Sequence, residues 1–205
     1  MSAILSLGIG YLIGCISPSA WISKKKHVDL KKEGTKNLGA TNTALVLGKK
    51  AGYFVLFFDI LKSLFSYKLA RWMFPHALLA GLFAGIGVIL GHCFPVFLHF
   101  QGGKGLAAFG GLVLAHDPWM FVLLLSLGIL LSFIMDYGVY LAVSAAVLFP
   151  ITSYLRSGSI ATFLTTGIAS GIILVMHRGN LIRAIRHEDP IHVRSGLKKI
   201  FGKNT

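Results

Sequence analysis

Residues 77–98 read ALLAGLFAGIGVILGHCFPVFL, and residues 119–135 read WMFVLLLSLGILLSFIM. Neither stretch contains Asp, Glu, Lys or Arg, and each approaches the roughly 20 apolar residues that a membrane-spanning helix needs. Of the 205 residues, 55% are hydrophobic and 13% are charged, against about 25% charged in a soluble domain. The mean hydropathy is +0.73. A chain of this size cannot bury so much apolar surface in a soluble core, which predicts an integral membrane protein.

Further apolar stretches continue this pattern along the chain. They cover residues 3–22, 51–69, 105–115, 139–155 and 160–176. Together with the first two, they predict an all-α polytopic membrane protein with seven transmembrane helices, of which the one at 105–115 is short and rich in Gly and Ala. We expect residues 1–205 to form a single integral membrane domain, in which residues 198–205 are a flexible basic tail.

The charge is strongly basic, with 20 Lys and Arg against 7 Asp and Glu and a net charge of +13. The basic residues lie between apolar stretches, which fits membrane topology and anionic headgroups better than nucleic-acid binding. They gather in residues 23–50 and in the tail from His177, whereas the opposite connections carry Arg71 and Arg156. The positive-inside rule then predicts an N-terminus outside and a C-terminus in the cytoplasm.

A first polar cluster covers residues 33–42, EGTKNLGATN. Small residues let the backbone approach an anion, and successive N–H groups can cradle a phosphate. The alternative is an ordinary loop in which Thr41 or Asn42 starts a helix, and spacing alone favours this alternative.

A second cluster joins residues 91–95, GHCFP, to residues 100–105, FQGGKG. The Gly-Gly-Lys-Gly turn is predicted to open a helix, whose N-terminus attracts anions while Lys104 adds a positive charge. The spacing is not that of a nucleotide-binding Walker loop. The alternative is a tight interhelical turn with Lys104 reaching the headgroups.

A third cluster covers residues 177–183, HRGNLIR, in which His177, Asn180 and Arg183 recur at helical spacing. Such a face can bind a phosphate and a hydroxyl together, or it can simply be a solvated basic extension of the last span.

Within an apolar stretch, Asp59 and Lys62 lie three residues apart. This spacing predicts first a structural ion pair and only second a contact to substrate.

Taken together, these residues resemble the bacterial acyl-phosphate–glycerol-3-phosphate acyltransferases, the PlsY family. The motifs that carry the resemblance are residues 34–42, Asp59-x-x-Lys62, residues 91–98, residues 102–105 and His177-Arg178-x-Asn180-x-x-Arg183. The resemblance implies a seven-helix protein of the bacterial cell membrane with its active site on the cytoplasmic side. It implies acyl transfer from acyl phosphate to the sn-1 hydroxyl of glycerol 3-phosphate, giving lysophosphatidic acid and phosphate in phospholipid synthesis. It implies no metal, no nucleotide cofactor and no nucleic acid, with membrane lipids and an acyl-phosphate-producing enzyme as the other candidate partners.

The resemblance also assigns roles to residues. Catalysis falls to Lys104, His177 and Asn180, with His177 a hypothetical proton acceptor that a ligand phosphate can replace. The residues implied in substrate binding are Thr35, Lys36, Asn37, Gly39, Thr41, Asn42, Gly102, Gly103 and Arg183. Among them, Asn37, Thr41 and Asn42 are assigned to shaping the loop. Those implied in supporting the site are Asp59, Lys62 and His92. We expect Thr35, Lys104, His177 and Asn180 to converge in one anion-binding pocket.

The sequence departs from the family pattern at several positions. Lys36 stands where a Gly is usual and would disfavour a positive φ; Leu45 stands in place of an Arg whose loss costs about 1.5–3 kcal/mol of binding. Ser63 replaces a Gly, and Ala108 replaces a Thr. A divergent relative with weak activity, or with only a lipid- or partner-binding role, is therefore the alternative hypothesis. A small anion transporter ranks last, because no internal repeat is visible.

Overall fold

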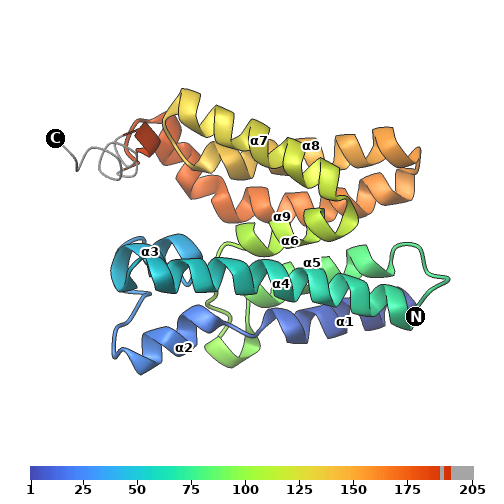
Figure 1. Ribbon diagram of the computed structural model, residues 1–205, viewed down its shortest axis with the longest axis horizontal. Coiled ribbons are helices and arrows are strands. Elements are labelled where there is room, and N and C mark those ends of the chain that lie inside the picture. Colours follow the sequence, from blue (N-terminus) through green and yellow to red (C-terminus); the bar gives the residue numbers. More distant parts are fainter. Residues whose placement is uncertain (190–191, 195–205) are drawn as a thin grey trace. The chain divides into compact units, whose positions relative to one another are not determined.

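The computed structural model describes residues 1–189 and 192–194 (Figure 1), so the predicted tail at 198–205 lies outside the described residues. Within the described residues the regular structure is helical, and an isolated bridge between Tyr137 and His192 forms no named strand. The prediction of an all-α protein is confirmed for this part of the chain. The chain divides into two compact units, Met1–Pro118 and the part from Trp119 onward, and each is described separately.

The first unit contains most of the polar motifs. Its helices are α1 (Ser2–Gly14), α2 (Pro18–Lys25), α3 (Ala40–Leu47), α4 (Lys49–Met73), α5 (Ala80–Cys93), the 3-10 turn η1 (Val96–Leu98) and α6 (Leu106–His116). Helix α5 packs against α1, α4 and α6, and α3 packs against α4. The stretch 77–98 therefore forms the centre of this unit.

The first apolar stretch is interrupted, although the sequence predicted one helix over residues 3–22. The break lies at Ser17, whose hydroxyl accepts the N–H of Ala20 at 3.4 Å, and Pro18 occupies the first position of α2. Proline disfavours a helical conformation in the residue before it and starts a new helix readily. The chain consequently changes direction before the lysine-rich segment.

Helices α1 and α5 cross at very close range through glycines. A Cβ atom at Gly14 would lie 2.4 Å from the carbonyl oxygen of Val88, and one at Gly91 would lie 2.1 Å from that of Tyr11. Each glycine has a partner four residues earlier, Gly10 and Gly87, which is the small-residue spacing of packed membrane helices. This crossing brings the end of α1 next to the end of α5, where the site residues begin.

In the described residues, five helical segments are long and apolar enough to cross a membrane. They are Ser2–Lys25 (α1 with α2), Ala80–Leu98 (α5 with η1), Pro118–Met135, Val139–Ser157 and Ile160–Ile185. Helix α4 has 25 residues but carries charged side chains along its length. Helix α6 has 11 residues and at about 1.5 Å per residue covers roughly half of a hydrocarbon core. A membrane protein with several spanning helices is thus supported, whereas seven spans stays a prediction.

The second unit contains α7 (Pro118–Met135) from Trp119 onward, α8 (Val139–Ser157) and α9 (Ile160–Ile185). Helices α8 and α9 pack together (Figure 1) and are joined by a short turn, in which Gly158 has a φ of 64° and the Ser159 hydroxyl accepts the N–H of Thr162 at 3.2 Å. Helix α9 continues past residue 176, the predicted end of the span. The third polar motif therefore lies on one continuous helix.

Candidate active site

The loop of residues 26–39 is closed by the buried side chain of Asn42. Its Oδ1 atom accepts the backbone N–H of Thr35 at 2.6 Å, and its Nδ2 atom donates to the carbonyl oxygens of Leu30 at 2.8 Å and Asn37 at 2.9 Å. A buried amide with this many partners fixes the backbone on both sides of the loop. Asn42 thus lies under the loop, where it determines loop shape.

The tip of this loop contains two residues with left-handed backbone conformations. Gly34 has a φ of 59° and Lys36 a φ of 55°. Lys36 therefore adopts the conformation that the sequence predicted it would disfavour, because a Cβ atom crowds the backbone there. The side chains of Thr35 and Lys36 are exposed, that of Asn37 is half-buried beside Gly39, and Thr41 is exposed in the first turn of α3.

The Gly102–Gly103 turn is bonded to the end of α5. The N–H of Gly102 donates to the carbonyl oxygen of Cys93 at 3.1 Å, and that of Gly103 donates to the carbonyl oxygen of His92 at 3.0 Å. A Cβ atom at Gly103 would lie 2.2 Å from Nε2 of His92 and 2.7 Å from the carbonyl oxygen of Leu38. Only glycine fits here, because α5 is on one side and the 26–39 loop is on the other.

Two side-chain bonds join the loop to its surroundings. The ammonium group of Lys31 donates to Oε1 of Gln101 at 3.1 Å, immediately before the glycine turn. The hydroxyl of Ser19 on α2 donates to the carbonyl oxygen of Leu38 at 3.3 Å. The first two polar clusters of the sequence therefore lie side by side.

Lys104 is half-buried directly before helix α6. Gly105 precedes the first turn with a φ of 81°, and no side chain caps the helix there. The first N–H groups of α6 thus point outward with a partial positive charge, which the Lys104 ammonium reinforces. The prediction that the Gly-Gly-Lys-Gly turn opens a helix is confirmed.

A charged cluster is buried beneath the glycine turn. Asp59 is 1% exposed and Lys62 5% exposed, and Nζ of Lys62 lies 2.7 Å from Oδ1 of Asp59. Nδ1 of His92 lies 3.3 Å from the same oxygen and 3.2 Å from Nζ of Lys62. Lys62 also donates to the carbonyl oxygens of Gly14 at 3.1 Å and Ile16 at 2.9 Å. The predicted Asp59–Lys62 pair is present, and through these bonds it connects α4 to α5 and to the end of α1.

Helix α9 carries the third motif in the second unit. His177 is buried, and its Nδ1 atom lies 2.9 Å from the carbonyl oxygen of Ile173. Because a carbonyl only accepts, Nδ1 carries the proton of this hydrogen bond. One turn further on, the guanidinium of Arg183 donates to Oδ1 of Asn180 at 3.0 Å.

A family model described as glycerol-3-phosphate acyltransferase matches residues 4–187. The chain belongs to the glycerol-3-phosphate acyltransferase family. The resemblance drawn from the motifs is thereby confirmed, as is the prediction of an acyltransferase.

Individual relatives agree with this membership over most of their length. A glycerol-3-phosphate acyltransferase of Staphylococcus aureus (strain Newman) is 34% identical over 199 residues, covering 93% of this chain and 98% of the relative. A glycerol-3-phosphate acyltransferase of Thermoanaerobacter sp. (strain X514) is 32% identical over 187 residues, covering 90% of this chain and 93% of the relative.

Two solved structures have the same fold. A crystal structure of PlsY, described as an integral membrane glycerol 3-phosphate acyltransferase in its glycerol 3-phosphate form, matches with a TM-score of 0.88 and 28% identity over 98% of this chain and all 100% of that one. A crystal structure of PlsY in its lysophosphatidic acid form matches with a TM-score of 0.82 and 28% identity, covering 92% of this chain and 94% of that one.

The site residues of this family member fall into two groups. The first unit brings the 26–39 loop, the glycine turn and His92 together around Gly103. The second unit places His177, Asn180 and Arg183 on α9. That both groups serve one pocket stays a prediction. Leu45, which the resemblance places where an Arg is usual, is 59% exposed on α3.

The sequence reasoning missed two features of this site. The Lys31–Gln101 bond joins residues 70 apart and has no local signal. The α1–α5 crossing could have been predicted, since Gly10 and Gly14 have the same four-residue spacing as Gly87 and Gly91.

Among the described residues, no group of three or more His, Cys, Asp and Glu side chains is placed to hold a metal ion.

Proposed function

We propose that this acyltransferase transfers a fatty acyl group from acyl phosphate to the sn-1 hydroxyl of glycerol 3-phosphate. The acyl carbon–oxygen bond to phosphate breaks, the ester bond forms, and lysophosphatidic acid and inorganic phosphate leave. The observation that carries the proposal is the match to a relative described in its glycerol 3-phosphate form, over 98% of this chain. Family membership over residues 4–187 supports it.

The chemistry requires placement of two anions more than it requires a strong nucleophile. Acyl phosphate is a mixed anhydride with a good leaving group, so its carbonyl carbon already reacts with an alcohol. The protein must hold two phosphates close together and stabilise the oxyanion that develops. Lys104, the start of α6 and the N–H groups of the 26–39 loop supply positive charge for this task, and the exposed Thr35 adds a hydroxyl donor.

His177 is proposed to take the proton from the attacking hydroxyl at Nε2, because its Nδ1–H is committed to the carbonyl of Ile173. The proton then passes to the departing phosphate. Arg183 orients the Asn180 amide by donating to Oδ1, so the direction of its NH₂ group is set by that bond. We assign Asn180 to the glycerol hydroxyls and Arg183 to orienting it.

Asp59, Lys62 and His92 are proposed as positioning residues. His92 contacts the buried ion pair through Nδ1, and its Nε2 and carbonyl oxygen both border Gly103. A buried ion pair has few alternative geometries, so it holds the end of α5 in one place. The glycine turn, and Lys104 after it, are positioned by that contact.

We propose that the chain has seven spans in the bacterial cell membrane, with its N-terminus outside and its C-terminus and active site in the cytoplasm. The lysines of residues 23–50 and the basic residues from Arg178 onward support this orientation through the positive-inside rule. Acyl phosphate must then be supplied by an enzyme that produces it at the cytoplasmic face.

The donor is tested by giving the purified chain, in detergent with glycerol 3-phosphate, either palmitoyl phosphate or palmitoyl-coenzyme A. We expect lysophosphatidic acid, with an equal amount of inorganic phosphate, from the first donor alone. Turnover with the coenzyme A thioester and none with palmitoyl phosphate would overturn the donor assignment while leaving the family unchanged.

A further inference from the structure

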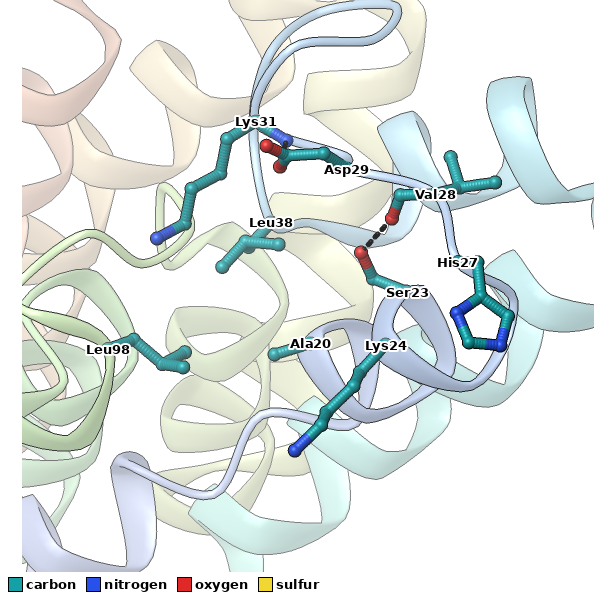
Figure 2. Close-up of a pocket in the computed structure, with 9 residues that line it drawn as sticks. All are labelled: Ala20, Ser23, Lys24, His27, Val28, Asp29, Lys31, Leu38 and Leu98. Atoms are coloured by element: carbon teal, nitrogen blue, oxygen red, sulfur yellow. Dashed lines mark hydrogen bonds between the residues drawn. The ribbon is translucent and has the colours of Figure 1, made fainter.

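A hollow of about 310 Å³ lies in the first unit between α2, the 26–39 loop and the turn η1 (Figure 2). Its apolar lining includes Ala20, Leu38 and Leu98, and its charged lining includes Lys24 and Lys31. The two lysines come from different segments, yet Figure 2 shows both ammonium groups on the side where Leu98 lies. The hollow thus combines a cationic rim with an aliphatic lining.

The one carboxylate in the lining is engaged within its own loop. Oδ1 of Asp29 accepts the backbone N–H of Lys31 at 3.0 Å, and Oδ2 lies 3.7 Å from Nζ of Lys32. Lys24 lies in the last turn of α2, followed by Lys25 and Lys26. The rim therefore has a net positive charge, which favours an anionic group.

The residues around the hollow indicate that it lies at the level of the lipid headgroups. Helix α2 ends the apolar segment Ser2–Lys25, and Trp21 on that helix and Phe97 in η1 are both exposed. Exposed aromatic residues beside lysines are typical of the headgroup layer. A free anion would use the lysines but gain nothing from Leu38 and Leu98, whereas a phospholipid uses both.

We propose that this hollow binds the phosphate headgroup of an anionic phospholipid, with the upper part of an acyl chain over Leu98 and Ala20. The lining contains none of the side chains proposed for catalysis or substrate binding, although the 26–39 loop borders both sites. Lys31 bonds to Gln101 immediately before the glycine turn, and the carbonyl of Leu38 borders Gly103. Any effect of the bound lipid on turnover rests on the proposed function, whereas the binding itself does not.

The test measures lipid binding to the full chain in a neutral detergent by native mass spectrometry. Phosphatidylglycerol is the anionic probe and phosphatidylcholine the zwitterionic one. Removing both rim charges in the double variant Lys24→Gln, Lys31→Gln should weaken phosphatidylglycerol binding about tenfold or more. The matched control is Lys25→Gln, Lys26→Gln, which removes the same charge from neighbouring positions outside the hollow and should change binding less than about twofold.

Ala20→Phe fills the hollow without changing charge and should also weaken phosphatidylglycerol binding. Circular dichroism of each variant checks that the helices remain. Equal loss in the two double variants would show diffuse attraction to a basic surface and would overturn the proposal. It would equally be overturned if inorganic phosphate displaced phosphatidylglycerol with the same affinity, because the hollow would then be a free-anion site. Acyltransferase activity is not part of the readout, so failure here leaves the proposed function standing.

Discussion

Nδ1 of His92 lies 3.3 Å from Oδ1 of Asp59 in the apolar interior of the first unit, and both groups also contact Lys62. His92 is at the end of α5 and Asp59 is in the middle of α4, so the contact connects two helices at a charged point. On the other side, His92 borders Gly103. The buried cluster is therefore continuous with the turn that precedes Lys104.

Replacing Asp59 by Asn should strongly destabilise the protein. The change leaves the Lys62 ammonium buried without its counter-charge, and breaking a buried pair costs about 3–5 kcal/mol. Thermal unfolding in detergent measures the effect. Asp29→Asn is the control, because its pair with Lys32 is solvent-exposed and such pairs contribute at most about 1 kcal/mol.

The double variant Asp59→Leu, Lys62→Met separates the contribution of the ion pair to folding stability from its contribution to the position of His92. Replacing both charges by apolar groups of similar size often restores stability. We expect recovered thermal stability together with a reduced kcat, because His92 no longer has a charged partner. Full recovery of kcat in the stable double variant would contradict the positioning role.

Gly103→Ala should reduce activity without unfolding the protein. The new Cβ atom would meet Nε2 of His92 at 2.2 Å and the Leu38 carbonyl oxygen at 2.7 Å, so the turn must move. A displacement of about 1 Å in a positioned group can cost about 100-fold in rate. The readout is kcat/KM for glycerol 3-phosphate; Gly167→Ala on α9, with nothing within 4 Å of its Cβ, should match the parent.

Leu45→Arg should raise kcat/KM for glycerol 3-phosphate. Leu45 is 59% exposed on α3, so the longer side chain has room. A charged hydrogen bond to a phosphate contributes about 1.5–3 kcal/mol, or roughly tenfold to 150-fold in binding. Leu45→Met controls for side-chain length. An unchanged rate in the Arg variant would show that the missing cation does not limit this enzyme.

The turn between α7 and α8 should loosen in acid. The pKa of Asp136 lies below its ordinary value of about 3.9, mainly because the carboxylate accepts the backbone N–H of Arg194 at 2.7 Å, with a further contribution from His192. A depressed pKa in the folded state gives stability that is complete above the unfolded pKa and is lost as the pH falls through the folded one.

Hydrogen exchange at the Arg194 amide, followed from pH 6 to about pH 3, measures this loss. Protection should fall at the acid end in the parent protein. Asp136→Asn keeps an acceptor oxygen but cannot titrate, so its protection should be lower and independent of pH. A parent curve as flat as that of the Asn variant would contradict the assignment.

The sequence predicted what depends on local rules. Spacing of three residues predicted the Asp59–Lys62 pair. The resemblance marked Lys36 as a departure from a Gly and predicted that it would disfavour a positive φ, but its φ is 55°. The predicted span ends at residue 176, and α9 continues to Ile185, as the helical spacing of His177, Asn180 and Arg183 indicated. Ser17 and Pro18 form a cap-and-proline signal for the α1–α2 break that was overlooked.

What the sequence did not predict depends on long-range contact. His92 meets a pair that is 30 residues away along the chain, and no periodicity encodes that distance. Asn42 was assigned to shape the loop, but its bonds to Leu30, Thr35 and Asn37 depend on how a 14-residue loop folds back, which composition does not determine. The hollow beside α2 arises from three segments and has no motif at all.

The most direct test of the central claim is the release of inorganic phosphate from palmitoyl phosphate with and without glycerol 3-phosphate. Purified parent protein should release phosphate only when glycerol 3-phosphate is present. Lys104→Ala and His177→Gln should each abolish that release, whereas Lys50→Ala, an exposed lysine at the start of α4, should leave it intact. Release that proceeds equally without glycerol 3-phosphate, or that survives in the folded Lys104 and His177 variants, would contradict the account.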